Sequence, residues 1–363
     1  MDKNVREHFT KIDFNTQDNL STLKNVEERI LWLSTRMIDW ANRRDDVDVK
    51  VGGHQASSAS MVSIMTALWF AYINGDDKVA VKPHASPVFH SIKYLTGELD
   101  KSYLYRLREF GGLQAYPSRT KDPDVFDYST GSVGLGAVAP LFSAATNRYV
   151  QSHFGDAPSS RFISVVGDAE LDEGNVWEAI CDPITRGLSN FTMVVDLNRQ
   201  SLDRVVPDMT VNRLKGFFLN AGWQVLEVKY GRRLLEAFDK PGGDALRFLI
   251  DSMPNERYQS LFSYDGNKLR EELLESSEID LQNLLDLYDD LELRSLVTDL
   301  GGHDLGLLID TFKRCDDEQE KPSVVFAYTI KGWGLPMAGH PLNHSALMSS
   351  DQIDQFRLDV GLT

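Results

Sequence analysis

Two short apolar runs near the middle of the chain have the pattern of neighbouring buried strands. Phe162–Val166 and Phe191–Val195 are rich in β-branched and aromatic residues, and each run ends at polar residues. Between them, apolar residues at helical spacing predict a helix over about 172–186, and Gly187 stands where a helix C-terminal glycine belongs. The pattern therefore predicts a βαβ unit with two parallel strands.

A polar side chain with a hard oxygen follows each of these strands. Asp168 comes after the first run and Asn198 after the second. Because the carboxyl ends of parallel strands meet at one edge of a sheet, we expect the two side chains to lie close together. Mg²⁺ prefers one or two protein oxygens together with phosphate oxygens, so the spacing is typical of a metal–phosphate site.

Apolar spacing elsewhere predicts the rest of an α/β fold, a parallel sheet flanked by helices on both faces. Residues 1–25 are polar and are predicted to be a partly extended N-terminal extension. Helices are predicted over about 25–44, 60–73, 98–110, 135–152 and 209–221, with short helices through 232–300. Further strands are predicted at 79–81, 222–228 and 323–329.

The charge balance disfavours several classes of partner. The chain has 38 Lys and Arg against 54 Asp and Glu, a net charge of −16, which disfavours nucleic acids and anionic membranes.

No apolar run is long enough to span a bilayer, and the first residues lack an apolar signal core, so we expect a cytoplasmic protein. Cys181 and Cys315 lack the spacing of a zinc site, which favours reduced thiols.

The sequence motifs around the central βαβ unit resemble those of a known family. GDAELDE at 167–173 and DLNRQSLD at 196–203 are similar to the diphosphate–metal motif of thiamine diphosphate (ThDP) enzymes of the transketolase-like superfamily. The nearest resemblance is to the diphosphate-binding domain of the homodimeric-type bacterial pyruvate dehydrogenase E1 component. Four other phrases match in the same order: GGHQAS at 52–57, HASP at 84–87, TGSVGLG at 130–136 and TIKGWG at 329–334. The resemblance implies one such domain over 26–363.

The resemblance also implies roles for individual residues. The Mg²⁺ ligands would be Asp168, Asn198 and the Gln200 carbonyl, and the catalytic histidines would be His54, His84 and His344. His340, on the same loop as His344, remains a competitor for that role. The implied cofactor-binding residues are His54, Ser57, His84, Ser132, Val133, Gly167, Asp168, Ala169, Glu170, Asn198, Gln200 and Lys331.

Four positions depart from the family pattern. Lys82, followed by Pro83, stands where a Gln-Gly pair is usual; it either alters which acid is accepted or is a solvated lysine. Ala169 replaces the third glycine of GDG, and Asp196 replaces the first asparagine of an Asn-x-Asn pair. Asp196 is the member that does not bind metal, so binding through Asn198 is expected to survive.

By resemblance, the chain is an enzyme component that uses ThDP and Mg²⁺ to decarboxylate a 2-oxo acid, with pyruvate the first expectation. The acyl unit would pass to a lipoyl-domain protein or, in a carboligation, to an aldehyde or ketone. The match covers neither a pyrimidine-binding domain nor a C-terminal domain, so we expect a separately encoded β subunit that carries the activating glutamate, in an α₂β₂ heterotetramer.

Two alternatives remain. The chain would be a non-catalytic scaffold or regulatory subunit if the fold is used for binding alone. A nicotinamide-dependent dehydrogenase is disfavoured, because the glycine cluster at 130–136 lacks the G-x-G-x-x-G order.

Overall fold

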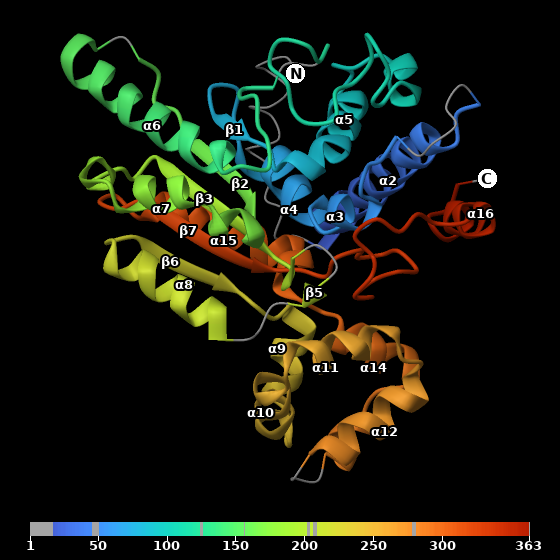
Figure 1. Cartoon of the computed structure of the whole chain (residues 1–363). Helices are drawn as coiled ribbons and strands as arrows, with labels where there is room; N and C mark the ends of the chain where they lie inside the picture. Colours follow the sequence, from blue (N-terminus) through green and yellow to red (C-terminus); the bar gives the residue numbers. More distant parts are fainter. Residues whose placement is uncertain are drawn as a thin grey trace.

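A five-stranded parallel sheet forms the centre of the part of the chain that the structure describes (Figure 1). The computed structural model describes residues 17–45, 51–123, 126–155, 157–201, 204–205, 209–277 and 281–362. The strand order across the sheet is β1-β2-β3-β7-β6, and every neighbouring pair is parallel. The strands are β1 (Lys78–Ala80), β2 (Phe162–Gly167), β3 (Phe191–Leu197), β6 (Gln224–Val228) and β7 (Ser323–Tyr328), with a separate antiparallel pair, β4 (Gln200–Ser201) and β5 (Arg204–Val205).

Helices bury both faces of the sheet, so alternate residues of a strand enter different cores. On β3, Met193 and Val195 join one core with helices α6 (Leu135–Phe154), α7 (Gly174–Cys181) and α8 (Met209–Asn220). Val194 joins the core on the other face, with α2 (Gln17–Asn42), α4 (Val62–Ala67), α5 (Ser86–Leu95) and α15 (Leu305–Asp317). Burial on both faces explains why β2 and β3 read as continuous apolar runs rather than alternating ones.

The helices on the N-terminal side of β3 differ in regularity. The α-helices are α2 (Gln17–Asn42), α3 (Gln55–Ala59), α4 (Val62–Ala67), α5 (Ser86–Leu95), α6 (Leu135–Phe154) and α7 (Gly174–Cys181). Between them lie the π-helical η1 (Leu68–Tyr72) and the 3₁₀ segments η2 (Pro83–Ala85), η3 (Lys101–Tyr105), η4 (Asp168–Asp172) and η5 (Pro183–Thr185).

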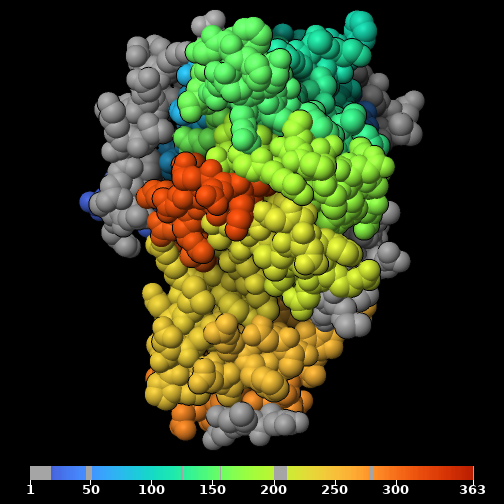
Figure 2. All heavy atoms as spheres, turned by 90° about the vertical axis from the view of Figure 1, so that its left-hand side faces the viewer, coloured from blue at the N-terminus to red at the C-terminus, as the bar shows by residue number. Residues whose placement is uncertain are grey.

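The remaining helices include a group that gathers below the sheet in Figure 1, coloured yellow to orange, which also forms the lower half of the face in Figure 2. This group is α9 (Arg232–Phe238), α10 (Gly243–Ser252), α11 (Asn255–Ser260), η6 (Leu261–Ser263), α12 (Gly266–Ser276), α13 (Gln282–Leu285) and α14 (Asp290–Val297). Outside the group are α8 (Met209–Asn220), η7 (Gly301–His303), α15 (Leu305–Asp317) and α16 (Ser350–Asp359).

The predicted fold class is confirmed, and so is the predicted βαβ unit, because β2 and β3 pair in parallel. Several predicted helices are wrong in detail. The helix predicted over 98–110 is only the 3₁₀ segment η3, followed by a bridge between Leu107 and Leu113. The helix predicted over 60–73 is split between α4 and η1, and the one predicted over 172–186 is divided between α7 and η5.

The N-terminal extension is only partly described. Residues 17–25, predicted to be partly extended, belong to α2, which begins at Gln17 rather than near Asn25. Residues 1–16 lie outside the described part of the chain.

Replacing Phe326 tests the packing between the sheet and α8. Phe326 is fully buried in β7 and its ring lies 5.7 Å from that of Phe218 in α8. Phe326→Ala should lower the free energy of unfolding by about 3–5 kcal/mol because it leaves a cavity. Urea denaturation followed by circular dichroism measures the change. Phe248→Ala, at a side chain that is 69% exposed, is the matched control and should change stability by less than about 0.5 kcal/mol; equal effects of the two variants would contradict this packing.

Candidate cofactor site

The ends of β2 and β3 bring the predicted metal ligands to one edge of the sheet. Gly167 and Asp196 are register partners, so Asp168 and Asn198 leave neighbouring strands side by side. The Arg199 N–H donates to Asp168 Oδ2 at 3.0 Å, and the Ala169 N–H donates to Oδ1 at 2.9 Å. These bonds hold the turn after β3 against the Asp168 carboxylate.

Burial disfavours the ionised form of two carboxyl groups at this edge, Asp168 and Glu170. Burial, and then the neighbouring Asp196, raises the pKa of Asp168 to about 7. Burial also raises the pKa of Glu170 to about 7, and Glu170 Oε2 is buried without a hydrogen-bond partner among the described residues. A divalent cation here would favour the ionised carboxylates, and the oxygens of Asp168, Asn198 and the Gln200 carbonyl are of the type that Mg²⁺ prefers.

Asp196 is fully buried and accepts hydrogen bonds from several elements. Oδ2 accepts from Lys82 Nζ at 2.6 Å, from the Ser60 hydroxyl at 2.8 Å and from the Asn198 amide at 3.4 Å. Oδ1 accepts from the Thr329 hydroxyl. Burial alone would raise the pKa of Asp196, but Lys82 and these hydrogen bonds hold it below its ordinary value.

Lys82 is not a solvated lysine, which corrects one of the two readings of the sequence. The residue is only 7% exposed and forms a buried ion pair with Asp196. Burial would lower the pKa of Lys82, but the Asp196 carboxylate raises it above the ordinary value. Gly167 leaves space for this lysine: an added Cβ there would lie 3.1 Å from Lys82 Cε and 3.3 Å from Nζ.

Three histidines from distant parts of the chain meet next to Lys82. The rings of His54 and His344 stack with centroids 4.2 Å apart, and the His84 ring meets His54 edge-on at 4.5 Å. His54 Nδ1 is 2.7 Å from the His344 carbonyl oxygen, so this nitrogen is the donor. Lys331 is buried, and its Nζ lies 3.3 Å from His344 Nδ1.

The geometry distinguishes the two loop histidines. His344 belongs to the histidine cluster, whereas His340 is exposed and its Nδ1 accepts from the Leu342 N–H at 3.1 Å. Burial, and then the neighbouring His54, Lys82 and His344, lowers the pKa of His84 to about 3, so its imidazole is neutral near pH 7.

Other predicted residues lie around this edge without a direct contact to Asp168 among the hydrogen bonds of the described residues. Ser57 is buried in α3, one turn after His54. Ser132 and Val133 are exposed just before α6, and Asn175 in α7 donates to the Val133 carbonyl at 3.2 Å. Gly134 (φ +79°) makes this approach possible, because an added Cβ would lie 2.6 Å from Asn175 Oδ1.

His303 packs against Ile330 and Trp333 rather than joining the histidine cluster. Its Nε2 accepts from the Ile330 N–H at 2.8 Å, and its ring stacks on Trp333 at 4.7 Å. Asp304, not His303, caps α15 by accepting from the Leu307 N–H. Sequence reasoning also missed Tyr116, whose ring lies 5.6 Å from that of His84.

Among the described residues, no group of three or more His, Cys, Asp or Glu side chains is arranged to hold a metal ion. The site implied at the sheet edge is of another kind, because its protein ligands are one carboxylate, one amide and one backbone carbonyl. None of the helices in the described part of the chain is both long and apolar enough to cross a membrane.

Curated relatives are pyruvate dehydrogenase E1 components. The one from Corynebacterium glutamicum is 29% identical over 350 residues, a match that covers 93% of this chain and 37% of that protein. The one from Mycobacterium tuberculosis is 30% identical over 330 residues, with 86% and 35% covered. The chain therefore spans little more than a third of the length of these relatives.

Solved transketolases share the fold. The structure from Campylobacter jejuni matches with a TM-score of 0.63 and 17% identity, over 94% of this chain and 43% of that one. A transketolase mutant from Pichia stipitis matches with a TM-score of 0.63 and 18% identity, over 94% and 41%.

A family model described as 1-deoxy-D-xylulose-5-phosphate synthase matches residues 42–242, which is more than half of the 363 residues. The family match, the relatives and the shared fold agree with the motifs at the sheet edge. The chain therefore belongs to the thiamine diphosphate-dependent, transketolase-like family and is a domain of its N-terminal type.

Proposed function

We propose that this chain is the diphosphate- and Mg²⁺-binding component of a two-component enzyme that decarboxylates a 2-oxo acid, pyruvate first, and transfers the acyl unit to an acceptor. The observation that carries the proposal is the meeting of Asp168 and Asn198 at the sheet edge, beside the buried Lys82–Asp196 pair and the histidine cluster.

Different residues at the sheet edge bind the metal, the diphosphate and the rest of the cofactor. Bound thiamine diphosphate supplies the electron sink for decarboxylation. Asp168, Asn198 and the Gln200 carbonyl hold Mg²⁺, and a lysine ammonium at Lys331 attracts the diphosphate as a point charge. The remaining contacts to the cofactor are assigned to His54, Ser57, His84, Ser132, Val133, Gly167, Ala169 and Glu170.

The histidines bind and orient the acid and its acceptor. His84 is neutral near pH 7, so it offers one donor and one acceptor nitrogen without repelling Lys82. In neutral His54, Nδ1 carries the proton that bonds the His344 carbonyl, which leaves Nε2 as the basic atom. His54 and His344 are therefore the proton-transfer candidates, and His84 is an orienting group.

The acceptor is a lipoyl group or a small aldehyde or ketone, and turnover with each class separates these outcomes. The same assays test the alternative of a non-catalytic scaffold, because a scaffold would turn over neither. The retained Asp168 and Asn198 favour the catalytic component over the scaffold.

An exposed apolar face of α6 supports a partner next to the cofactor. Leu135 is 51% exposed, Phe142 39% and Tyr149 56%, and their spacing of seven residues puts them on one face of the helix. Val133, which is 53% exposed and is assigned above to the cofactor, stands two residues before the start of this helix. The occupant is the pyrimidine-binding domain, on a separate β subunit of an α₂β₂ assembly.

Two of the departures from the family pattern, Lys82 and Asp196, compensate each other. Lys82 and Asp196 are 114 residues apart in sequence, yet their opposite charges form a single buried ion pair. A lone charge at either position would be costly, whereas the pair keeps the edge of the sheet as neutral as two amides would. Asn198 consequently retains its place beside Asp168.

Asp168→Ala tests the metal assignment. In the complex with its partner, the variant should bind ThDP in the presence of Mg²⁺ at least about 100-fold more weakly, because a charged ligand of the metal is lost. Isothermal titration calorimetry measures this affinity. Asp172→Ala, at the exposed end of the same acidic turn, should bind normally; unchanged affinity in Asp168→Ala would exclude the assignment.

Charged substitutions on α6 test the partner surface. Phe142→Glu and Tyr149→Glu should prevent co-purification with the product of the neighbouring open reading frame, because a desolvated charge opposes docking. Phe248→Glu, on an exposed aromatic of α10, is the control. Loss of co-purification with all three variants, or with none, would refute the assignment of this face.

Breaking the ion pair one residue at a time tests the compensation. Lys82→Gln should lower the free energy of unfolding by about 3–5 kcal/mol, because it leaves Asp196 buried without its cation. Adding Asp196→Asn to Lys82→Gln should restore about 2 kcal/mol of the lost free energy of unfolding. Urea unfolding measures both changes. The control is Arg257→Gln, which breaks the surface pair with Glu272 and should lower the free energy of unfolding by at most about 1 kcal/mol. A double variant no more stable than Lys82→Gln would mean that the charges do not compensate.

A further inference from the structure

A cavity opens beside Arg199 in the turn after β3, and no residue of the histidine cluster is among the described residues that line it. Its volume is about 610 Å³, within the range of small-molecule sites. The walls come from β6, the end of β7, α8, α10 and α11. None of the residues assigned above to the cofactor lines it.

The cavity is more positive than the protein as a whole. Among the described residues, its walls carry the cations Arg199, Lys215, Lys229 and Arg247 and the carboxylates Glu227 and Asp251. The chain itself has a net charge of −16. Positive charge concentrated in a concave surface of an acidic protein favours an anionic ligand.

Both carboxylates in the cavity are already neutralised. Glu227 accepts from Lys215 Nζ at 3.0 Å and from the Tyr328 hydroxyl at 2.7 Å. Asp251 accepts from Lys229 and from the Tyr230 hydroxyl, and Arg247 Nε lies 3.8 Å from it. The excess positive charge therefore belongs to the arginines.

Arg199 is the cation of this cavity whose buried donors are largely unpaired among the described residues. It is only 7% exposed, and its single guanidinium bond to a described residue runs from Nη1 to Asn255 Oδ1 at 3.3 Å. Nε and Nη2 are buried without a hydrogen-bond partner among the described residues. Buried unpaired donors on a charged group lower the stability of the fold. The Arg199 guanidinium is therefore suited to bind the oxygens of a phosphate or carboxylate.

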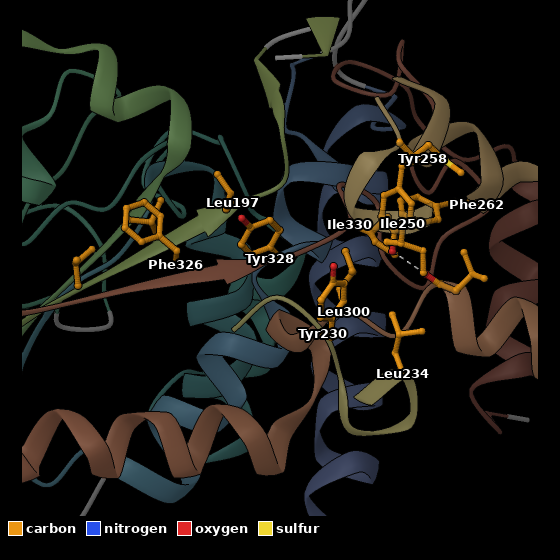
Figure 3. Close-up of a cluster of buried hydrophobic side chains, with 14 of the residues drawn as sticks. Leu197, Tyr230, Leu234, Ile250, Tyr258, Phe262, Leu300, Phe326, Tyr328 and Ile330 are labelled. Atoms are coloured by element: carbon orange, nitrogen blue, oxygen red, sulfur yellow. Dashed lines mark hydrogen bonds between the residues drawn. The ribbon is translucent and has the colours of Figure 1, made fainter. Parts of the chain in front are cut away.

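Three tyrosines give the cavity an aromatic wall. Tyr230, Tyr258 and Tyr328 come from the loop after β6, from α11 and from the end of β7, and they can be followed in Figure 3. The Arg199 guanidinium carbon lies 4.9 Å from the Tyr258 ring centroid and 5.7 Å from that of Tyr328. The Tyr258 and Tyr328 rings hold the guanidinium in place, and all three tyrosines contribute aromatic surface to the cavity lining.

We propose that this cavity binds a small phosphate monoester with a planar or aromatic body, the phosphate on the Arg199 guanidinium and the body against the tyrosines. The two cations in excess of the carboxylates match the two charges of a phosphate monoester. The site lies apart from the proposed diphosphate site, although the Arg199 N–H also bonds Asp168.

Calorimetric titration of the full chain with phenyl phosphate at low ionic strength, without ThDP or Mg²⁺, tests the proposal. Phenyl phosphate should bind more tightly than inorganic phosphate, and phenol should not bind. Arg199→Met should weaken binding by about tenfold or more, and Arg199→Lys should retain part of it. Arg357→Met, which removes an exposed cation of α16, should have no effect.

Lys331→Met separates this cavity from the diphosphate site, because it removes the cation assigned to the cofactor. Binding of phenyl phosphate that survives Lys331→Met and is lost in Arg199→Met supports the proposal, whether or not the chain binds ThDP. Binding lost in Lys331→Met and retained in Arg199→Met, or no binding at all, would overturn it. Tighter binding of benzoate than of phenyl phosphate would overturn the choice of phosphate.

Discussion

The edge of the sheet depends on one buried carboxylate, Asp196. Its two oxygens accept hydrogen bonds from Ser60, Lys82, Asn198 and Thr329, which belong to four separate parts of the chain. A buried charge is tolerated only where such partners are fixed around it, so Asp196 imposes their positions on one another. The places of His84, two residues after Lys82, and of Lys331, two residues after Thr329, follow from these same contacts.

The sequence predicted the elements whose signal is local or set by parallel pairing. The apolar runs of β2 and β3 predict buried strands, and parallel strands place Asp168 and Asn198 together at one edge. The histidines at 54, 84 and 344 were found through phrases of the family rather than through spacing, and the structure brings the three rings together. Their chemical roles remain predictions.

Other features depend on contacts that no local pattern contains. Lys82 reads as a surface lysine because its partner lies 114 residues away. The charges over 98–110 resemble a solvated helix, but Arg106 pairs with Glu109 across a turn and Arg108 donates to the Val51 carbonyl. Arg199 lies between two predicted metal ligands, with its side chain in another cavity and its backbone at φ +61°. A left-handed conformation at a non-glycine residue is sparsely populated and depends on its surroundings.

The metal assignment is tested most directly by an anomalous diffraction map of the complex crystallised with ThDP and Mn²⁺ in place of Mg²⁺. We predict one manganese peak at the carboxyl edge of the sheet, with Asp168, Asn198 and the Gln200 carbonyl as its protein ligands. A peak at any other protein ligands, or bound ThDP without a metal at this edge, would contradict it.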